Sequence, residues 1–263
     1  NIPNRQKTVT DIQALLQPKL EPFLQNIKCH LGAFLIKVPN PRSFTFPHQD
    51  WLFVDNDKTN EFFSATIWIT LEDITPDNGS LGFIKGSHQF LNNIVGSPSP
   101  QLVTATMGHE GLLLSYLDFP EIKAGDALMF NNKTVHAAFP NNSDFDRMAI
   151  GIGITPKEAD LYHYFLKPGT TDKILKLKVK DSFFIHNVHD QLRDYYLAGE
   201  IPPNTEIVEE LDYAPKLYNA KELEQIMIAN GNVKNNSPMA EMINNYMNGG
   251  TFSKIKATAK YFL

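Results

Sequence analysis

The stretch FPHQDWLFVD, residues 46–55, places a histidine and an aspartate two positions apart in an otherwise mostly apolar run. In an extended segment, residues i and i+2 point to the same face, so we expect the side chains of His48 and Asp50 to project together. Burying an imidazole beside a carboxylate is costly unless a mutual hydrogen bond or a metal ion compensates. The stretch therefore predicts either a hydrogen-bonded His–Asp pair or part of a metal site.

The composition is that of an ordinary globular protein, with 263 residues, 42% of them hydrophobic and 20% charged. A formal net charge of −5 makes a nucleic-acid polyanion an unexpected partner, which leaves a small molecule as the expected one. A single cysteine, Cys29, excludes an intrachain disulfide and a thiolate zinc site, and is typical of a reducing compartment. Oligomeric state has no signature in the sequence.

No part of the sequence predicts a membrane span or a secretory signal. The longest apolar runs, such as residues 31–38, are far shorter than the roughly 20 residues that a transmembrane helix needs. No signal-peptide pattern opens the sequence, although Asn1 rather than Met stands first and leaves room for residues before it. We therefore expect a soluble, cytoplasmic protein.

Short runs rich in β-branched and aromatic residues predict strands between about residues 30 and 155. The runs are GAFLIKV (32–38), FFSATIWITL (62–71), GLLLSYL (111–117), DALMF (126–130) and RMAIGIGI (147–154). Turn-forming clusters separate them and no βαβ alternation is present, so a parallel sheet is not expected. The pattern predicts a mostly β fold of jelly-roll type, a cupin-like double-stranded β-helix with helices flanking it at both ends.

Helical patterns flank this core. Residues 8–28 predict a helix that begins at Thr10 or Asp11 and is broken by Pro18 and Pro22. After residue 156, helices are expected at 186–199, 219–231 and 237–247, an edge strand at 173–180, and a linker or lid at 201–215. We expect residues 1–263 to form a single catalytic domain, with a core at about 30–155 and a helical or lid extension at about 156–263.

A second pair of polar residues is spaced for a hairpin. His136 and Arg147 are separated by 11 residues, with Asn141 and Asn142 at the midpoint. If the chain reverses there, His136 and Arg147 become cross-strand neighbours on one face. A salt bridge to Asp144 or Asp146 is the alternative for Arg147.

The spacing His48-X-Asp50, then His136, then Arg147 resembles the phytanoyl-CoA dioxygenase family of iron(II)/2-oxoglutarate-dependent dioxygenases. The blocks that carry the resemblance are HQDW (48–51), WITLED (68–73), DNGSLGFIKGSH (77–88) and AGDALMFNNKTVHAAFPNNSDFDR (124–147), within about residues 30–155. The resemblance implies that His48, Asp50 and His136 bind Fe(II), because two imidazoles and one carboxylate form the facial triad of non-haem iron oxygenases.

The resemblance also implies a site for 2-oxoglutarate. Arg147 would bind its far carboxylate, for which a planar guanidinium suits better than lysine. Gln49 and Trp68 stand at positions near the cosubstrate, although plain core packing is an equal alternative for Trp68. Ala138 stands where several members of the family have a hydroxyl-bearing residue. On the strand of Arg147, the small residues at 149, 151 and 153 share its face and would leave room for the cosubstrate.

The implied activity is hydroxylation of an unactivated C–H bond with dioxygen, yielding succinate and carbon dioxide, on a small molecule or lipid-like acid. Halogenating relatives replace the carboxylate ligand with a small residue, so the presence of Asp50 argues against halogenation. Desaturation, cyclisation or epimerisation at the same iron centre remain alternatives. So does a catalytically silent jelly-roll protein that binds a small molecule.

Two further patterns have structural explanations. His186, His189 and Asp190 would lie at i, i+3 and i+4 of one helix and could bind zinc, but helical amphipathicity explains the same spacing. Cys29 is expected to be a small buried apolar residue.

Overall fold

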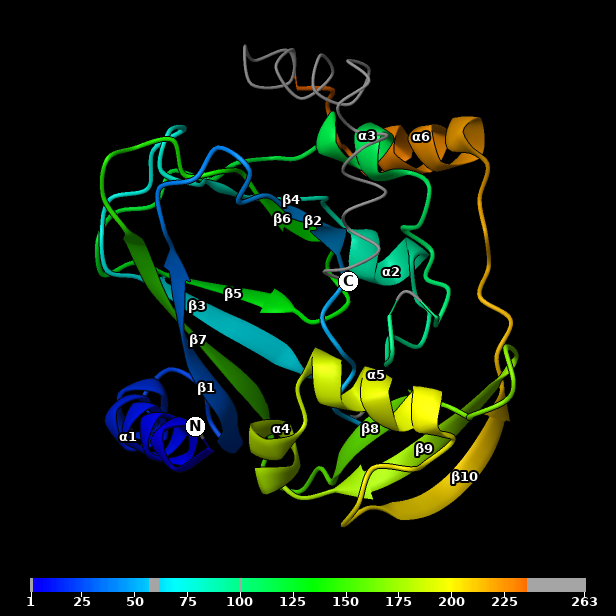
Figure 1. Cartoon of the computed structure of the whole chain (residues 1–263). Coiled ribbons are helices and arrows are strands. Elements are labelled where there is room, and N and C mark those ends of the chain that lie inside the picture. Colours follow the sequence, from blue (N-terminus) through cyan, green and yellow to red (C-terminus); the bar gives the residue numbers. More distant parts are fainter. Residues whose placement is uncertain (1, 57–61, 100, 236–263) are drawn as a thin grey trace.

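Three antiparallel sheets organise the computed structural model, which describes residues 2–56, 62–99 and 101–235 (Figure 1). The four-stranded sheet has the order β1 (Ile27–Lys37), β7 (Arg147–Pro156), β3 (Ala65–Thr70) and β5 (Ala127–Asn131). A short sheet has the order β2 (Thr45–His48), β6 (His136–Ala138) and β4 (Leu81–Phe83). The third sheet has the order β10 (Glu206–Asp212), β9 (Lys173–Val179) and β8 (Leu161–Leu166).

The four-stranded sheet and the short sheet pack face to face. Trp68 of β3 and Ala149 of β7 belong to the same buried cluster as Leu81 of β4 and Ala138 of β6. Phe130 of β5 likewise contacts Phe83 of β4, with ring centroids 5.0 Å apart. The predicted mostly β fold, a double-stranded β-helix with flanking helices, is confirmed.

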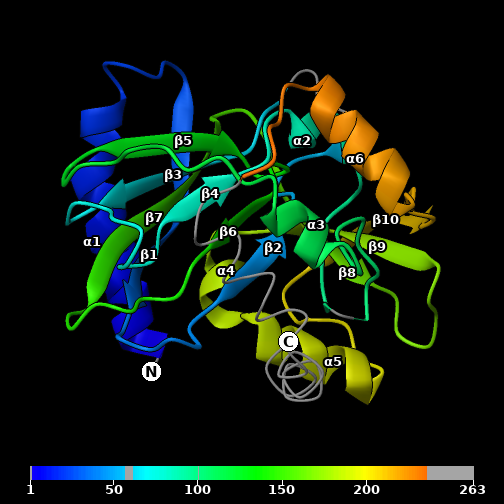
Figure 2. The same ribbon diagram turned by 90° about the horizontal axis from the view of Figure 1, so that it is seen from above.

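Helix α1 (Ile2–Leu20) covers the outer face of the four-stranded sheet (Figures 1 and 2). Its Ile12 and Leu16 pack against Ile67 of β3, so the alternate positions Thr66, Trp68 and Thr70 face the interior. The predicted start at Thr10 or Asp11 and the break at Pro18 are wrong. Pro18 lies in the last turn of the helix, where it removes one hydrogen bond to the carbonyl four residues earlier, but the helix ends two residues later.

The apolar run at 111–117 is not a strand. It contributes to α3 (Glu110–Leu114), which lies beside α6 (Ala220–Ala229) and near α2 (Ser87–Phe90) in Figure 1. Leu113 and Leu114 share one buried cluster with Leu223 and Met227 of α6. A short buried run has no periodicity that separates helix from strand, and packing against α6 determines the result.

The expected hairpin between His136 and Arg147 is also wrong. β6 pairs with β2 and β4, whereas β7 pairs with β1 and β3, so the connecting segment crosses from one sheet to the other. The cross-strand partners of His136 are His48 and Phe83, and the partner of Arg147 is Lys37. Turn residues at 140–144 signalled a reversal but carried no information about which sheet follows.

The C-terminal part contains a sheet as well as helices. β9 is its central strand rather than an edge, and the segment 201–215, expected to be a linker or lid, supplies β10. Helices α4 (Ser182–His186) and α5 (His189–Ala198) lie against this sheet, with Leu192 packed on Leu175 and Leu177 (Figure 1). The predicted end at Gly199 and start at Asn219 are confirmed, and the helix expected at 237–247 lies outside the described residues.

Within the described ranges, every helix is too short or too polar to traverse a lipid bilayer.

Candidate metal site

The short sheet brings two histidines together from segments far apart in the sequence. His48 ends β2 and His136 begins β6, and the two are direct partners in the antiparallel register. Their ring centroids are 4.2 Å apart. Asp50 follows two residues after His48, where its backbone N–H donates a hydrogen bond to the carbonyl of Asn132 at 2.8 Å. The backbone therefore fixes the positions from which all three side chains extend.

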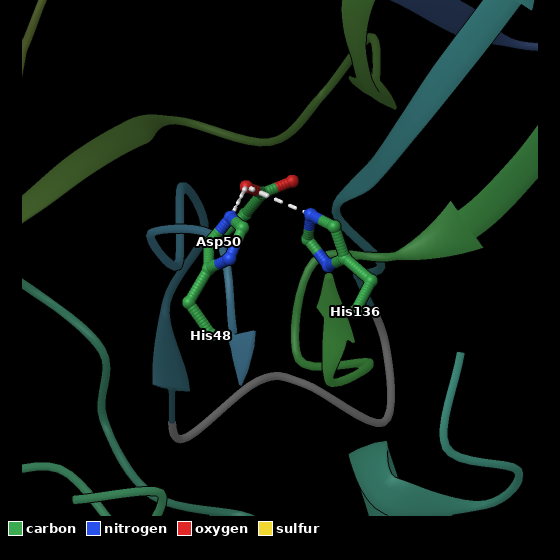
Figure 3. A group of neighbouring side chains, drawn as sticks. All are labelled: His48, Asp50 and His136. Atoms are coloured by element: carbon green, nitrogen blue, oxygen red, sulfur yellow. Dashed lines mark ion pairs between the residues drawn. The ribbon is translucent and has the colours of Figure 1, made fainter. Parts of the chain in front are cut away.

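The three side chains point toward a common centre (Figure 3). The Oδ1 atom of Asp50 lies 3.8 Å from the Nε2 atom of His48 and 3.8 Å from the Nε2 atom of His136. One ligand atom from each residue lies within 4.8 Å of the others. Ligand atoms about 2.1 Å from a shared ion can be up to about 4.2 Å apart, so both 3.8 Å pairs can share one metal ion.

Hydrogen bonds at the other ring nitrogens orient both histidines. The Nδ1 atom of His48 lies 2.8 Å from the carbonyl oxygen of Phe46, and the Nδ1 atom of His136 lies 2.9 Å from that of Thr134. A carbonyl accepts only, so each Nδ1 carries the proton and each Nε2 presents a lone pair to the centre. Such bonds are typical of metal-binding histidines.

The second carboxylate oxygen of Asp50 is held by neighbours. Thr66 Oγ1 donates to Oδ2 at 2.8 Å, and Asn132 Nδ2 donates to the same oxygen at 3.3 Å. Asn132 Nδ2 also donates to Thr66 Oγ1, and Ser64 Oγ donates to Asn132 Oδ1. This network leaves Oδ1 as the oxygen that faces the histidines. Thr66 and Asn132 were not predicted from the sequence, since neither carries a spacing signal.

The protonation states suit metal binding. Burial and the neighbouring His136 lower the pKa of His48 to about 4, which leaves its imidazole neutral at pH 7. Burial alone would raise the pKa of Asp50, but the two histidines and the hydrogen bonds from Thr66 and Asn132 lower it below its usual value. A neutral imidazole and an ionised carboxylate are the forms that bind a cation.

The site opens on the side of His48. The His48 side chain is 41% exposed, compared with 27% for Asp50 and 9% for His136. The rings of Phe130 and Phe83 contact His136, with centroids 4.8 and 6.1 Å away, and form an apolar wall on the closed side. A molecule can therefore approach the three ligand atoms past His48 and not past His136.

Arg147 places a buried cation on the inner face of β7. The residue is 4% exposed, and its Nε and Nη1 atoms have no hydrogen-bond partner within the described residues. Its guanidinium lies over the ring of Trp68, 5.3 Å from the centroid, and no ion pair with Asp144 or Asp146 is found in the described chain. Burial lowers the pKa of Arg147, partly offset by the charge of Glu72. Unsatisfied N–H groups on a buried guanidinium indicate a site for an anion.

Lys37 is a second buried cation next to Arg147, and it was missed in the sequence. It is the register partner of Arg147, and its Nζ donates to the carbonyls of Ser43 and Ala138. Burial and the charge of Arg147 lower the pKa of Lys37 to about 7. The only signal in the sequence was a lysine within the apolar run 31–38.

The other residues expected near the cosubstrate are already hydrogen-bonded or closely packed against other side chains. The Nε2 atom of Gln49 donates to the carbonyls of Leu91 and Lys133, so its N–H groups are already engaged. Ala138 is buried with Trp68 and Ala149. The space beside Gly153 is filled by the ring of His30, and Leu35 lies close to Gly151, so the strand leaves less room there than expected.

Helix α5 brings a further histidine toward the site. The ring of His189, whose residue is exposed, packs on Trp51 with centroids 4.8 Å apart. Burial by surrounding protein and the charge of His48 lower the pKa of His189, and the charges of Asp190 and Asp50 partly oppose this. His189 therefore lies within electrostatic range of the metal ligands. It shares no helix with His186, and the only metal-ligand group found in the described residues is the His48 group.

One family model and several curated proteins are similar to this chain in sequence. A family model described as Phytanoyl-CoA dioxygenase (PhyH) matches residues 5–149. The chain is 27% identical over 129 residues to Phytanoyl-CoA dioxygenase 1 of Oryza sativa subsp. japonica, covering 48% of this chain and 44% of that protein. It is 30% identical over 120 residues to Phytanoyl-CoA dioxygenase domain-containing protein 1 of Danio rerio, covering 44% and 40%. The matched region thus spans less than half the length of these relatives.

Solved structures of non-haem enzymes are similar over part of the chain. The epimerase SnoN from nogalamycin biosynthesis, described as alpha ketoglutarate dependent, is 22% identical with a TM-score of 0.38, covering 52% of this chain and 49% of that one. The non-heme monooxygenase ThoJ in complex with Ni is 15% identical with a TM-score of 0.41, covering 83% and 66%.

Proposed function

Because the chain belongs to the phytanoyl-CoA dioxygenase family, we propose that it is an Fe(II)- and 2-oxoglutarate-dependent dioxygenase that hydroxylates an unactivated C–H bond. The observation that carries the proposal is the convergence of His48 Nε2, Asp50 Oδ1 and His136 Nε2 within 4.8 Å. The proposed substrate is a small molecule or lipid-like acid.

The donor set fits Fe(II). Two imidazoles and one carboxylate are the facial ligands of non-haem iron oxygenases, and they leave the opposite face of the ion for other ligands. Both Nδ1 atoms are occupied by carbonyls, and Asp50 Oδ2 is occupied by Thr66 and Asn132. Each residue therefore has one free donor atom, and these three atoms are the proposed iron ligands.

Arg147 is the proposed partner of the far carboxylate of 2-oxoglutarate. The partnerless Nε and Nη1 atoms of the buried guanidinium are free to donate hydrogen bonds to a bound carboxylate, and the ring of Trp68 lies against the guanidinium. When bound, iron with 2-oxoglutarate and dioxygen supplies a strong oxidant, and succinate and carbon dioxide are the co-products. The part of the chain is to hold these groups, orient the substrate and exclude water.

The surroundings support these tasks. Phe83 and Phe130 keep water from His136, and the exposed edge of His48 leaves a path for substrate. The rings of Trp51 and His189 pack together, His189 lies within electrostatic range of His48, and these two rings are the proposed first contacts of the substrate. Because His189 comes from α5, we further propose that residues 1–263 act as one catalytic domain. A cytoplasmic location is proposed because a single cysteine, Cys29, is typical of a reducing compartment. Burial and the charge of Glu21 raise the pKa of the Cys29 thiol to about 11, so the thiol is protonated at pH 7.

The test is an anaerobic titration with Fe(II) and 2-oxoglutarate. Wild-type protein is expected to bind one iron and to develop a weak visible charge-transfer band when 2-oxoglutarate is added. Arg147→Lys should keep its iron and require at least about tenfold more 2-oxoglutarate, since one bidentate charged interaction is lost. Asp50→Ala should lose iron. The proposal is refuted if protein with Asp50 intact neither binds iron nor forms succinate.

The outcomes also separate the alternatives. A product mass increased by one oxygen identifies hydroxylation, whereas loss of two hydrogens identifies desaturation or ring closure, and an unchanged mass with altered stereochemistry identifies epimerisation. Tight binding of a metabolite without affinity for iron would instead identify a catalytically silent binding protein. A thermal-shift screen of metabolites with a non-oxidising metal and 2-oxoglutarate is the first step toward the substrate.

A further inference from the structure

A pocket lies between the loop that follows β2 and helix α2. It has a volume of about 230 Å³, with the buried residues Ser64 and Lys133 in its lining. His88 and Asn92 line the side formed by α2 and the residue that follows its C-cap. The pocket is distinct from the iron ligands.

The pocket contains a buried cation whose hydrogen-bond partners are all neutral. Lys133 is 4% exposed, and its Nζ donates to the side-chain oxygens of Asn92 and Asn56. Both partners are uncharged amides. None of the described residues that line the pocket is acidic, and no ion pair of Lys133 is found in the described chain. Burial lowers the pKa of Lys133 to about 8, so the ammonium is still mostly protonated at pH 7.

A buried charge without a counter-ion is costly, and the buried Lys176 shows one way in which this chain offsets that cost. Lys176 is equally buried, but its Nζ lies 2.7 Å from a carboxylate oxygen of Asp55. Lys133 has no such carboxylate, although it lies beside a space that a small molecule can enter. Polar groups from Ser64, Asn131 and His88 surround the same space.

We propose that this pocket binds a small oxyanion, a carboxylate or phosphate group, with Lys133 as its charged ligand and Asn92 and His88 beside it. The volume decides the size class, because pockets for drug-sized ligands span about 300–1,000 Å³ and this one is smaller. The anion is either free or the terminal group of a larger molecule that extends outward.

The pocket is connected to the metal site by hydrogen bonds. Ser64, which lines the pocket, donates to Asn132, and Asn132 donates to the Asp50 carboxylate. Ser64, in the lining of the pocket, therefore lies two hydrogen bonds from a proposed iron ligand. The proposal does not depend on iron chemistry, and metal-free protein can test it.

The first experiment measures thermal stability and calorimetric binding with inorganic phosphate, at constant ionic strength set with chloride. The host is metal-free Arg147→Gln protein, so that the anion site at Arg147 does not contribute. We expect phosphate to raise the melting temperature in a saturable way. Lys133→Met should weaken binding by about tenfold or more, because a charged hydrogen bond is lost. Lys85→Met, at an exposed lysine outside the pocket, is the matched control and should bind phosphate unchanged.

The second variant gives Lys133 a negatively charged partner from the protein itself. Asn92→Asp is nearly isosteric and places a carboxylate against Lys133. We expect it to raise the melting temperature of the free protein and to abolish the response to phosphate. Asn142→Asp adds the same charge on an exposed loop elsewhere and should do neither. This pair keeps the test decisive even if Lys133→Met folds poorly.

The probes also distinguish the two sources of the anion. A phosphate monoester that binds at least as tightly as inorganic phosphate indicates the end group of a larger ligand, whereas exclusion of the monoester indicates a free anion. Succinate tests the carboxylate. Absence of any phosphate effect in the Arg147→Gln host would overturn the proposal, as would an equal effect in Lys133→Met or Asn92→Asp. If the iron and 2-oxoglutarate assays of the proposed function fail, the phosphate-binding result still stands, because it is measured on metal-free protein.

Discussion

The two carboxylate oxygens of Asp50 have different surroundings, and this difference defines the direction from which a cation is bound. Oδ2 accepts hydrogen bonds from Thr66 and Asn132, whereas Oδ1 faces the two histidine rings. Residues that orient a ligand in this way commonly change metal affinity by about 10- to 100-fold when removed.

Thr66→Val should therefore weaken metal binding by about 10- to 100-fold, because the isosteric side chain lacks the hydroxyl that orients Asp50. Anaerobic titration with Fe(II) or Co(II) measures the change. Thr66→Ser keeps the hydroxyl and should restore most of the affinity. Thr70→Val is the matched control, since its hydroxyl lies on the same face of β3 but bonds to the Glu72 carbonyl. Equal affinity in Thr66→Val and wild type would contradict this role.

Gly153→Ala should destabilise the protein by about 1–3 kcal/mol through overpacking. A Cβ atom at this position would lie 2.5 Å from the Cε1 atom of His30, a buried residue of β1 that is the register partner of Gly153. Urea unfolding measures the change. In a His30→Ala background the same substitution should cost much less, because the ring is gone. A cost that is the same in both backgrounds would show that the ring is not the cause.

The sequence predicted the residues that meet at the site better than it predicted their supports. His48, Asp50 and His136 carry a spacing that a strand-based fold can bring together, and their side chains meet in the structure. Thr66, Asn132 and Lys37 contribute through contacts between strands that are distant in the sequence, so no local pattern identified them. Gly153 was expected to make room for a cosubstrate, but which neighbour fills a gap depends on the register of β1.

At the scale of elements, strand β9 shows how position in a sheet changes the meaning of a pattern. The alternating lysines of KILKLKVK predicted an edge strand with a solvated face. β10 pairs with β9 and carries acidic residues, and Lys173 and Lys176 each have a carboxylate of β10 within ion-pair distance. Lys176 is buried and pairs with Asp55, whereas Lys178 pairs with Asp160 at the surface.

Lys176→Ala and Lys178→Ala should therefore differ strongly although both lie on β9. Lys176→Ala removes the 2.7 Å partner of a mostly buried carboxylate and should cost about 3 kcal/mol or more. Lys178→Ala breaks a pair whose side chains are exposed, and should cost less than about 1 kcal/mol. Chemical denaturation of both variants gives the comparison. Similar small costs would show that Lys176 is not held in a low-dielectric site.

The wrong element predictions have a common cause. The turn at 140–144 was correctly located, but a jelly roll passes the chain from one sheet to the other there, and turn chemistry is the same in both cases. The run 111–117 became α3 because α6, more than 100 residues later, supplies its packing partner. Caps at Asn219 and Gly199 were predicted because they depend on neighbours in the sequence.

At the scale of the whole molecule, two buried histidines lie where the C-terminal part packs on the four-stranded sheet. His30 of β1 contacts Phe53, and His163 of β8 contacts Trp51, with centroids 4.8 Å apart in each case. Burial lowers the pKa of both histidines to about 3. His163 has one hydrogen-bond partner, Ser97, whereas neither nitrogen of His30 has one among the described residues.

Stability should consequently fall as the pH is lowered from about 6.5 toward 3. In this window both histidines are protonated in the unfolded chain but not in the folded chain. The unfolded state therefore binds more protons, and the free energy of unfolding falls as the pH is lowered. Each histidine adds up to about 1.4 kcal/mol per pH unit. Urea unfolding at several pH values measures the slope. His30→Leu should reduce it, and His186→Gln, at an exposed residue, should not. An unchanged slope in His30→Leu would contradict the assignment.

The cross-strand pairing of Lys37 with Arg147 has a further consequence for ligand uptake. With a pKa of about 7, Lys37 is largely unprotonated at pH 8, held in that form by burial and by the guanidinium opposite. A dianion seated on Arg147 would neutralise that repulsion, so Lys37 should capture a hydrogen ion from the medium during association. Calorimetric enthalpies of 2-oxoglutarate binding at pH 8 should then vary with the ionisation heat of the buffer, and Lys37→Met should remove the variation.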